Sequence, residues 1–363
     1  MGLAAVVRMA RLCDRLALLP DICRRAAAEG AAPGGVLLVG RGEDTLAEFP
    51  FGDRTVAPER EPATLDTIYD LASLTKPIIT ATLFMQAVED GLINLMEPIG
   101  RWLPIPKENP VAEAMPYHLL LHTSGLPAGR PLPPGDVTPE VLVGAMTKEG
   151  LVHPPGTAFI YSDVGYHLLA CVLERLYDAP LADLARRRVL CPLGMCDTDY
   201  GVAPEKLARC APTESVEGTC LRGVVHDPAA RQMGGVAGHA GLFGTAHDLA
   251  RYCRMILRRG ECAGGRIMEP ATLDRMIAPV EVPGGKRRAL GWDVDTQYSS
   301  PRGELLPARG VGHTGYTGTS LWVDPPTGLF IILLTNRVHP DGHGDVVRLR
   351  RLAANVVAAA VLP

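Results

Sequence analysis

The stretch "LASLTKP", residues 71–77, places a serine and a lysine three positions apart, Ser73 and Lys76, where a predicted helix begins. The helix extends from Ser73 to about Glu89, is apolar on nearly every side, and is stopped by an Asp-Gly pair. A helix that is apolar all round is a buried one. Residues at i and i+3 lie on one helix face, so the two polar side chains can touch inside the core.

Two interpretations of this pair are open at this point. Ser is a good N-cap residue, and a Lys one turn later can point at water. Alternatively, the pair is a nucleophile and its base, because burial favours a neutral amine that can take a proton from the hydroxyl. Backbone N–H groups at a helix N-terminus also suit a developing oxyanion. Since Ser-x-x-Lys is frequent by chance, the rest of the chain has to decide.

A second motif is "PPGTAFIYSDVGYHLL", residues 154–169, where Tyr161, Ser162 and Asp163 lie between a Pro/Gly loop and a helix. The structural interpretation is that Ser162 or Asp163 caps the helix and Tyr161 packs. The functional interpretation places the Tyr161 phenol beside the Ser/Lys pair. A phenolate held by a cation would then act as general base and return the proton to the leaving group.

A third motif is "GHTGYTGTSLWVDP", residues 312–325, in which a His-Thr-Gly precedes strand-like residues. Such a segment predicts an edge strand along a cleft. A strand edge offers N–H groups to a substrate carbonyl and to an oxyanion.

Composition limits the functional classes. The chain has 363 residues with 47% apolar and 21% charged residues and a net charge of −4, typical of a globular protein that does not bind nucleic acid. We interpret the two basic clusters, Arg186–Arg188 and "GGKRRA" at 284–289, as solvated surface. The sequence contains no uninterrupted apolar run of about 18 residues, so we expect no membrane span. Residues 1–20 are interpreted as an amphipathic helix packed on the body.

The nine cysteines are scattered and include no Cys-x-x-Cys pair, so they predict neither a disulfide framework nor a zinc site. They favour small buried thiols in a reducing compartment, and hence a cytoplasmic location.

The order of predicted elements indicates an α+β fold. Strands are predicted at 34–56 and after 286, helices separated by Pro/Gly loops lie between them, and a last helix closes the chain. The simplest packing is one antiparallel sheet built from both termini and flanked by helices, with an inserted, mostly helical lobe. We place the first domain at 1–110 and 286–363 and the lobe at 111–285, with a small-molecule cleft between them.

Together, the motifs resemble the serine β-lactamase and penicillin-binding-protein superfamily, in particular its class C β-lactamase-like serine hydrolases and esterases. The order "SLTK", "YSD", "HTG" carries this resemblance, which covers the chain from about residue 30 to its end. Linking stretches that look similar are "IYDLASLTKP", "LLLHTSGLP", "PPGTAFIYSD", "GGVAGHAGLFGTAHDLA" and "LLTNRVHP". The resemblance implies a β-lactamase/transpeptidase-like fold and catalysis without a cofactor or a metal.

It also implies a role for each matching residue. Ser73 would be the acylated nucleophile, Lys76 would tune proton transfer, and Tyr161 would be the general base and acid partner. The backbone N–H groups of Ser73 and Tyr316 would form the oxyanion hole. The residues expected to contact a small ester or amide substrate are Asp163, His313, Thr314 and Gly315.

Two positions depart from the family pattern. Asp163 stands where Asn is frequent, and an ionised Asp only accepts hydrogen bonds. His313 stands where class C β-lactamases carry the Lys of K-T-G, and His is neutral much of the time near pH 7. Carboxylate recognition would be weak, so neutral esters are the expected substrates, and His313→Lys is expected to favour anionic ones. Alternatives are a DD-carboxypeptidase, a D-aminopeptidase or β-lactamase, an acyltransferase, or a non-catalytic binding protein.

The remaining histidines invite a metal interpretation. His226, Asp227 and His239 lie in "VVHDPAARQMGGVAGHAG", but their spacing matches no zinc signature. We expect hydrogen bonding within a Gly-rich loop bordering the site. His122, in "LLLHTSGL", is expected to be a hydrogen-bonded turn histidine.

Overall fold

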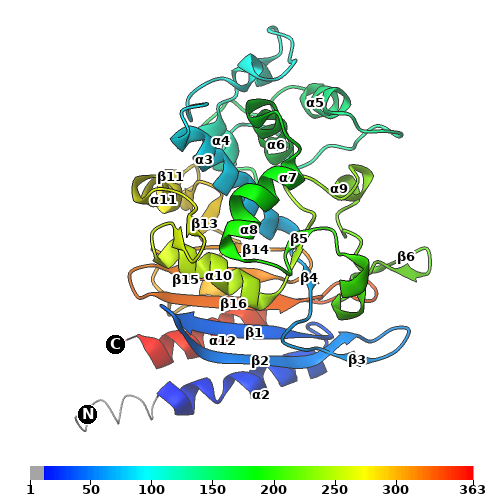
Figure 1. Cartoon of the computed structure of the whole chain (residues 1–363), viewed down its shortest axis with the longest axis vertical. Coiled ribbons are helices and arrows are strands. Elements are labelled where there is room, and N and C mark those ends of the chain that lie inside the picture. Colours follow the sequence, from blue (N-terminus) through cyan, green and yellow to red (C-terminus); the bar gives the residue numbers. More distant parts are fainter. Residues whose placement is uncertain (1–11, 363) are drawn as a thin grey trace.

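The computed structural model describes residues 12–362, and a nine-stranded antiparallel sheet is its central layer (Figure 1). The strand order is β11-β12-β13-β14-β15-β16-β1-β2-β3. The strands are β1 (Gly34–Arg41), β2 (Asp44–Thr55), β3 (Glu61–Pro62), β11 (Val280–Val282), β12 (Lys286–Ala289), β13 (Trp292–Asp295), β14 (Val311–Thr314), β15 (Ser320–Asp324) and β16 (Leu329–Thr335).

Strands from the two ends of the chain meet in the middle of this sheet, as the order of elements predicted. β1 pairs with β16, and Val36 lies opposite Leu334. Every residue of β16 is buried, as are all residues of β1 except Arg41. Both faces of the sheet are covered, which explains why these strands are continuous apolar runs instead of alternating ones.

Helices cover the two faces unequally. The terminal helices α2 (Leu19–Ala28) and α12 (Val347–Val361) pack together on one face, where a separate apolar cluster includes Leu37 and Trp322 (Figure 1). The other face is covered by α10 (Ala246–Leu257), which contacts β1 and β16 although its residues fall within the lobe predicted at 111–285. Of the amphipathic helix predicted at 1–20, residues 1–11 lie outside the described part of the chain.

The segment that carries Ser73 is less regular than predicted. A single helix was expected from Ser73 to about Glu89, but a 3₁₀ turn (Ala72–Leu74) leads into a π-helix (Lys76–Ala81) and then into α3 (Thr82–Glu89). Its burial and its end before Asp90 are as predicted. Ser73 therefore does not cap a regular helix, which removes the first interpretation of the pair.

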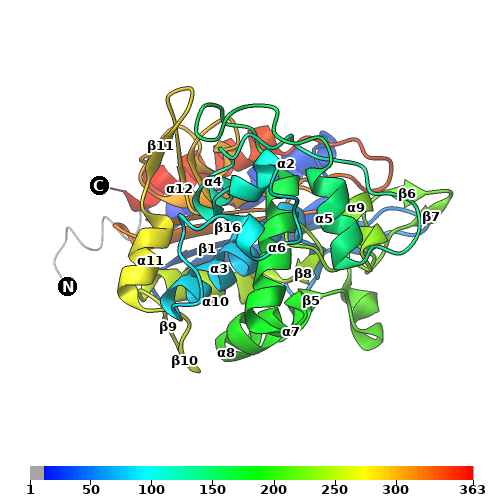
Figure 2. The same cartoon turned by 90° about the horizontal axis from the view of Figure 1, so that it is seen from above.

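The remaining helices are α4 (Pro116–Leu120), α5 (Pro139–Thr147), α6 (Asp163–Tyr177), α7 (Leu181–Ala185), α8 (Cys191–Leu193), α9 (Pro228–Gln232) and α11 (Pro270–Ile277). Among them, α4, α5 and α7 contact α6, and α11 contacts α3 (Figure 2). Short strands join them: β4 (Tyr69–Asp70), β5 (Asp199–Tyr200), β6 (Ser215–Val216), β7 (Thr219–Cys220), β8 (Leu242–Gly244), β9 (Glu261–Cys262) and β10 (Gly265–Arg266). The division of the chain into a domain of residues 1–110 and 286–363 and a lobe of residues 111–285 stays a prediction. No helix within residues 12–362 combines the length and the apolar character that crossing a membrane requires.

Candidate active site

Ser73 and Lys76 touch, as their spacing predicted. The Lys76 ammonium donates a hydrogen bond to Ser73 Oγ at 2.9 Å, and the lysine side chain has no exposed surface. The preceding residue, Ala72, has a φ of 47°, a conformation that is strained for a residue with a Cβ. Its N–H donates to the buried carboxylate of Asp70 at 2.8 Å, which holds the strained turn in place.

The charge state of Lys76 differs from the sequence expectation. Its Nζ lies 2.6 Å from Oδ1 of Asp163 and donates to the carbonyl of His239 at 3.1 Å. Burial would lower the pKa of Lys76, but the Asp163 carboxylate and the Tyr161 hydroxyl act more strongly in the opposite direction, and the net pKa is raised. The prediction of a neutral amine is therefore wrong, because a counter-ion 87 positions away in the sequence lies against it.

Tyr161 lies beside this pair, with its ring centroid 5.0 Å from Lys76 Nζ. Burial raises the pKa of Tyr161, and the nearby ammonium works against that rise. The His122 ring stacks on the Tyr161 ring at 4.3 Å, and His122 Nδ1 accepts a hydrogen bond from the N–H of Ser162 at 2.9 Å. His122 is thus a hydrogen-bonded turn residue, as expected, and it also orients the tyrosine.

Ser162, and not Asp163, caps the helix behind Tyr161. Ser162 Oγ accepts a hydrogen bond from the N–H of Gly165 at 3.3 Å. Asp163, the first residue of α6, is left to face Lys76. The structure therefore brings together the three motif residues Ser73, Lys76 and Tyr161 and adds Asp163 to them.

The His-Thr-Gly segment ends β14 directly beside the serine turn. Thr319 Oγ1 donates to the carbonyl of Leu71 at 3.0 Å, and Thr317 Oγ1 donates to that of Asp70 at 2.7 Å. A Cβ on Gly315 would lie 2.7 Å from the Leu71 carbonyl oxygen and 2.1 Å from Thr319 Oγ1, so only glycine fits this approach. Close packing here brings the backbone that follows β14 up to Ser73.

His313 is buried and neutral. Its Nδ1 lies 2.9 Å from the carbonyl oxygen of Thr314, and because a carbonyl only accepts, Nδ1 carries the hydrogen. Burial lowers the pKa of His313 well below its usual value, and the cations Arg288 and Lys76 lower it further. Nε2 is therefore an acceptor, and that the ring does not hold a substrate carboxylate stays a prediction.

These residues line one pocket of about 750 Å³. Ser73, Tyr161, Asp163, His313, Thr314, Gly315 and Tyr316 all contribute to its wall, so every predicted site residue except the fully buried Lys76 borders it. The Tyr316 side chain is 62% exposed at the rim, with the His226 ring stacked at 5.5 Å on it and the Arg337 guanidinium 4.6 Å from its centroid.

The pocket wall also contains Arg288, which the sequence interpretation placed on the solvated surface. This interpretation of "GGKRRA" is wrong for Arg288, whose side chain is fully buried, and fits better for Arg287, which pairs with Asp295 at the surface. The error has a physical reason. Alternate side chains on β12 point to opposite faces, and the sequence does not reveal which face meets the pocket.

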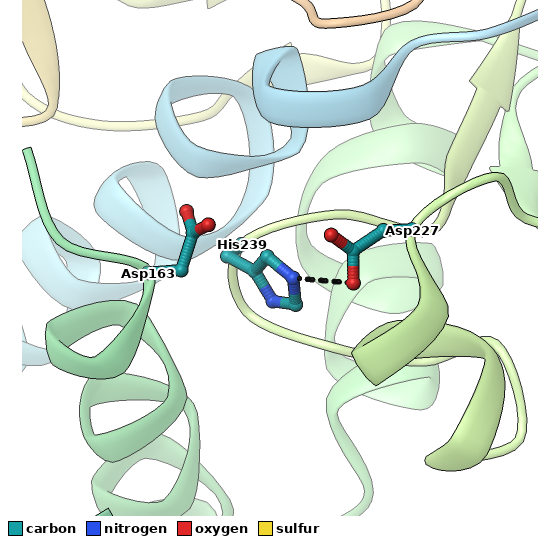
Figure 3. A group of neighbouring side chains, drawn as sticks. All are labelled: Asp163, Asp227 and His239. Carbon is teal, nitrogen blue, oxygen red and sulfur yellow. Dashed lines mark ion pairs between the residues drawn. The ribbon is translucent and has the colours of Figure 1, made fainter. Parts of the chain in front are cut away.

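Asp163, Asp227 and His239 form a cluster of titratable side chains (Figure 3), of which Asp163 contacts Lys76. One ligand atom from each lies within 4.8 Å of the others, and His239 Nε2 is 2.9 Å from Asp227 Oδ1. Burial would raise the pKa of Asp227, but the His239 hydrogen bond and other contacts lower it overall. The Lys76 ammonium already neutralises Asp163, so we interpret the group as the electrostatic surroundings of the lysine and assign no metal to it.

His226 lies apart from this group, although the sequence placed it in the same loop. The backbone N–H of His226 donates to the Asp70 carboxylate at 2.7 Å, and the ring Nε2 of His226 lies 3.4 Å from a carboxylate oxygen of Glu214. Through Asp70, this loop is tied to the serine turn, as expected for a loop that borders the site by hydrogen bonding.

Comparison with known proteins shows which family the chain resembles. The family model described as Beta-lactamase matches residues 19–355. The N-acetylmuramyl-L-alanine amidase of Bacillus subtilis is 31% identical, over 85% of this chain and 78% of the amidase. A putative D-alanyl-D-alanine carboxypeptidase of Salmonella paratyphi A is 28% identical, over 83% of this chain and 75% of that protein.

The solved structures share the fold. A class C β-lactamase from Rhodobacter sphaeroides superposes with a TM-score of 0.76 at 20% identity, covering 96% of this chain and all of that one. The mixed helical and antiparallel-sheet fold is thus β-lactamase/transpeptidase-like, as the motifs indicated. With a family model that spans nearly the whole described chain, this protein belongs to the β-lactamase family of serine hydrolases.

Proposed function

We propose that the protein hydrolyses small esters or amides through an acyl-enzyme on Ser73. The observation that carries this proposal is the 2.9 Å hydrogen bond from a buried lysine ammonium to Ser73 Oγ at the wall of a 750 Å³ pocket. A hydroxyl in this position is held, oriented and electrostatically supported by an ammonium that water does not reach.

In the proposed reaction, the Tyr161 phenolate is the form that accepts the proton of Ser73, and the Lys76 ammonium stabilises its charge. Ser73 Oγ then attacks the substrate carbonyl carbon, whose oxygen becomes an anion held by the backbone N–H groups of Ser73 and Tyr316. The Tyr161 phenol gives its proton to the departing oxygen or nitrogen as the bond to the carbonyl carbon breaks. Water repeats the sequence to release the acid from Ser73.

The names of the relatives support a substrate of this class. The amidase and the carboxypeptidase are both named for breaking amide bonds. Ser73, Lys76 and Tyr161 are all present, which speaks against a silent binding protein. The alternatives of β-lactamase and acyltransferase activity differ only in the leaving group or in the acceptor that replaces water, and the same acyl-enzyme serves all of them.

A fluorophosphonate that mimics the tetrahedral intermediate tests the assignment. Mass spectrometry of the intact protein should show one added phosphonyl group, and peptide mapping should place it on Ser73. Ser73→Ala should abolish both labelling and ester turnover with little change in melting temperature. Ser124→Ala is the matched control, because Ser124 is a buried serine that does not line the pocket, and its variant should label normally. Label on Ser124 or Ser162, or none, would make the proposal wrong.

We also propose a cytoplasmic location. All nine cysteines are free thiols. Only Cys23, Cys171, Cys210 and Cys253 are buried, so the expectation of mostly buried thiols is wrong, and Cys13, Cys191 and Cys196 are exposed. Such usage suits a reducing compartment. Fractionation of cells that produce the native protein tests this, and recovery with the periplasmic or secreted fraction would contradict it.

A further inference from the structure

We propose that Arg350 is a positioning residue for catalysis, because its guanidinium orients and polarises the Gly315–Tyr316 peptide whose N–H is to hold the oxyanion. This inference rests on the proposed acyl-enzyme at Ser73 and adds a residue to the support of its oxyanion hole. No sequence motif points to Arg350, which lies on the last helix, α12.

The guanidinium of Arg350 contacts the turn that follows β14. One of its terminal nitrogens donates to the carbonyl of Thr319 at 2.7 Å and makes a longer contact of 3.4 Å with the carbonyl oxygen of Gly315. The same Thr319 carbonyl accepts a hydrogen bond from the N–H of Gly315 at 2.7 Å. Gly315 is therefore held at both of its backbone polar groups, and the arginine takes part on each side.

The carbonyl of Gly315 and the N–H of Tyr316 belong to one peptide unit. This unit is planar and trans, so its C=O and its N–H point in opposite directions. A carbonyl directed at Arg350 therefore turns the Tyr316 N–H away from the arginine. Hydrogen bonds in a chain polarise one another, and a cation at the carbonyl end makes the N–H at the other end a stronger donor.

The opposite side of Gly315 packs against the serine turn. A Cβ on Gly315 would lie 2.7 Å from the carbonyl oxygen of Leu71 and 3.3 Å from the Cβ of Ala72, the residue before Ser73. The turn after β14 is thus fixed between the serine turn and α12. A shift of this turn would change the distance from the Tyr316 N–H to Ser73, and oxyanion stabilisation depends on that distance.

Stability alone does not explain a cation at this position. Arg350 is 8% exposed, and its Nε has no hydrogen-bond partner within residues 12–362. Burial is the main cause that lowers the pKa of Arg350 to about 9, the cation Arg337 adds to this effect, and Asp345 opposes it. The guanidinium therefore keeps its charge near pH 7, but at a cost in free energy.

The two carbonyls do not need the arginine as a donor. A backbone N–H already serves each of them, that of Gly315 for Thr319 and that of Gly318 for Gly315, at 2.7 and 3.1 Å. Removing the guanidinium leaves neither carbonyl without a partner, and replacing buried ionic groups by apolar side chains of similar size is often neutral for stability. The arginine adds a positive charge and a fixed direction for the Gly315 carbonyl.

Arg350→Met tests the inference, because it removes the charge and keeps a side chain of similar length. We expect kcat for acylation by phenyl acetate, a neutral ester, to fall by about tenfold to a hundredfold, less than or equal to the effect of removing an oxyanion-hole donor outright. Rates are divided by the number of sites that the phosphonate labels, so an unfolded fraction does not enter. Arg350→Lys keeps a charge and a donor and should recover about threefold or more of the loss.

A transition-state analogue separates the oxyanion hole from substrate binding. When Ser73 Oγ adds to the boron of phenylboronic acid and its proton passes to Tyr161, the boron becomes tetrahedral and negatively charged. The inhibition constant should rise in Arg350→Met by about the same factor as kcat falls. The ester concentration that gives half the maximal single-turnover rate should change by less than about twofold, because the ground-state carbonyl carries little charge.

Arg351→Met is the matched control, because Arg351 is the next residue of α12 and its exposed guanidinium pairs with Glu304 at the surface. It should leave the rate and the inhibition constant unchanged. If Arg350→Met does not fold, Arg350→Gln, which keeps a donor and loses the charge, replaces it in the comparison with Arg350→Lys. Unchanged constants without the charge, a lysine variant no better than the uncharged one, or a loss seen only as weaker ester binding would each overturn the inference.

Phosphonate labelling distinguishes this inference from the proposed function. If the phosphonate labels Ser73 in the wild type and in Arg350→Met, and both proteins are acylated at the same rate, the Arg350 inference fails alone. If Ser73 is not labelled and phenyl acetate is not turned over, the proposed function fails and the inference fails with it.

Discussion

The ammonium of Lys76 lies 2.6 Å from the carboxylate of Asp163, and this contact favours the charged form of the lysine against its burial. The lysine is fully buried, and burial without a counter-ion would favour the neutral amine. Ser162 takes the N-cap position of α6, which leaves Asp163 as the first residue of the helix. The end of α6 therefore supplies the counter-ion of Lys76, a residue that the sequence alone would treat as a base.

We predict that Asp163→Asn lowers the pKa of Lys76, because the carboxylate that raises it is removed while burial remains. An opposite charge at this distance is worth about one to three pKa units. If protonated Lys76 supports the Tyr161 phenolate, the alkaline limb of the kcat/KM profile moves to lower pH by at least about one unit. Glu140→Gln, which removes an exposed carboxylate from a surface ion pair with Arg175, is the control. An unchanged alkaline limb would show that deprotonation of Lys76 is not the cause of the loss of activity at high pH.

Tyr161→Phe should lower kcat by about 10²–10⁴, the scale of a general acid–base group. Substrate binding to the Ser73→Ala background should change little, because only a hydroxyl is removed and the ring still stacks on His122. The check is kcat from single-turnover acylation together with Kd by calorimetry. Nearly full activity would make Tyr161 a packing residue and leave proton transfer to Lys76.

The wild-type rate should rise with pH from neutral to mildly alkaline conditions. Burial raises the pKa of Tyr161, so the phenolate is the minor form near pH 7, and its fraction increases tenfold per pH unit below that pKa. We therefore expect log kcat/KM for a neutral phenyl ester to rise with a slope of about one between pH 7 and 9. Stopped-flow acylation in constant-ionic-strength buffers measures this. A flat profile across that range would rule out the phenolate as base.

Folding stability should fall as the pH drops below about 6.5. Burial lowers the pKa values of His122, His167 and His313 well below the usual histidine value. Below about pH 6.5 these histidines bind protons in the unfolded chain but not in the folded protein. The free energy of unfolding is therefore largest above the pKa of the unfolded histidines and decreases as the pH falls. Each histidine contributes a slope of up to about 1.4 kcal/mol per pH unit.

Urea unfolding at pH 7.5, 6 and 5 checks this dependence. His167→Phe should reduce the slope, because it removes one buried titrating group, whereas His153→Gln at an exposed position should not change it. Equal slopes for wild type and His167→Phe would contradict the assignment of His167 as a neutral buried histidine.

His313→Lys should destabilise the protein instead of simply favouring anionic substrates. A lysine at this buried position would face two cations, Arg288 and Lys76, which already act on His313. The cost of an uncompensated buried charge is about 3–5 kcal/mol. Because this lysine's folded pKa would lie below about 10.4, stability should recover as the pH rises towards that value. His313→Gln, which adds no charge, should melt near the wild type, and a His313→Lys protein as stable as wild type at pH 7 would contradict the buried, cationic surroundings.

Local spacing made much of the molecule predictable from its sequence. A Ser and a Lys three apart face each other on any helical turn, so the contact between Ser73 and Lys76 followed even though the turn is 3₁₀ and then π-helical. Strand-like segments at 34–56 and after 286 required one sheet from both ends, because strands need partners and their apolar faces need cover. Membership of the family followed from motifs whose chemistry depends on residue type and order.

Other features were decided only by the tertiary structure. The charge of Lys76 depends on Asp163, and the sequence does not state how close two groups from separate elements will come. Arg288 and Arg287 are adjacent and chemically identical, yet one is buried in the pocket wall and the other is at the surface. The pleat of β12 separates them, and only packing determines which face of the strand is the pocket. Charge and solvation act through space, so the chain order alone leaves both undetermined.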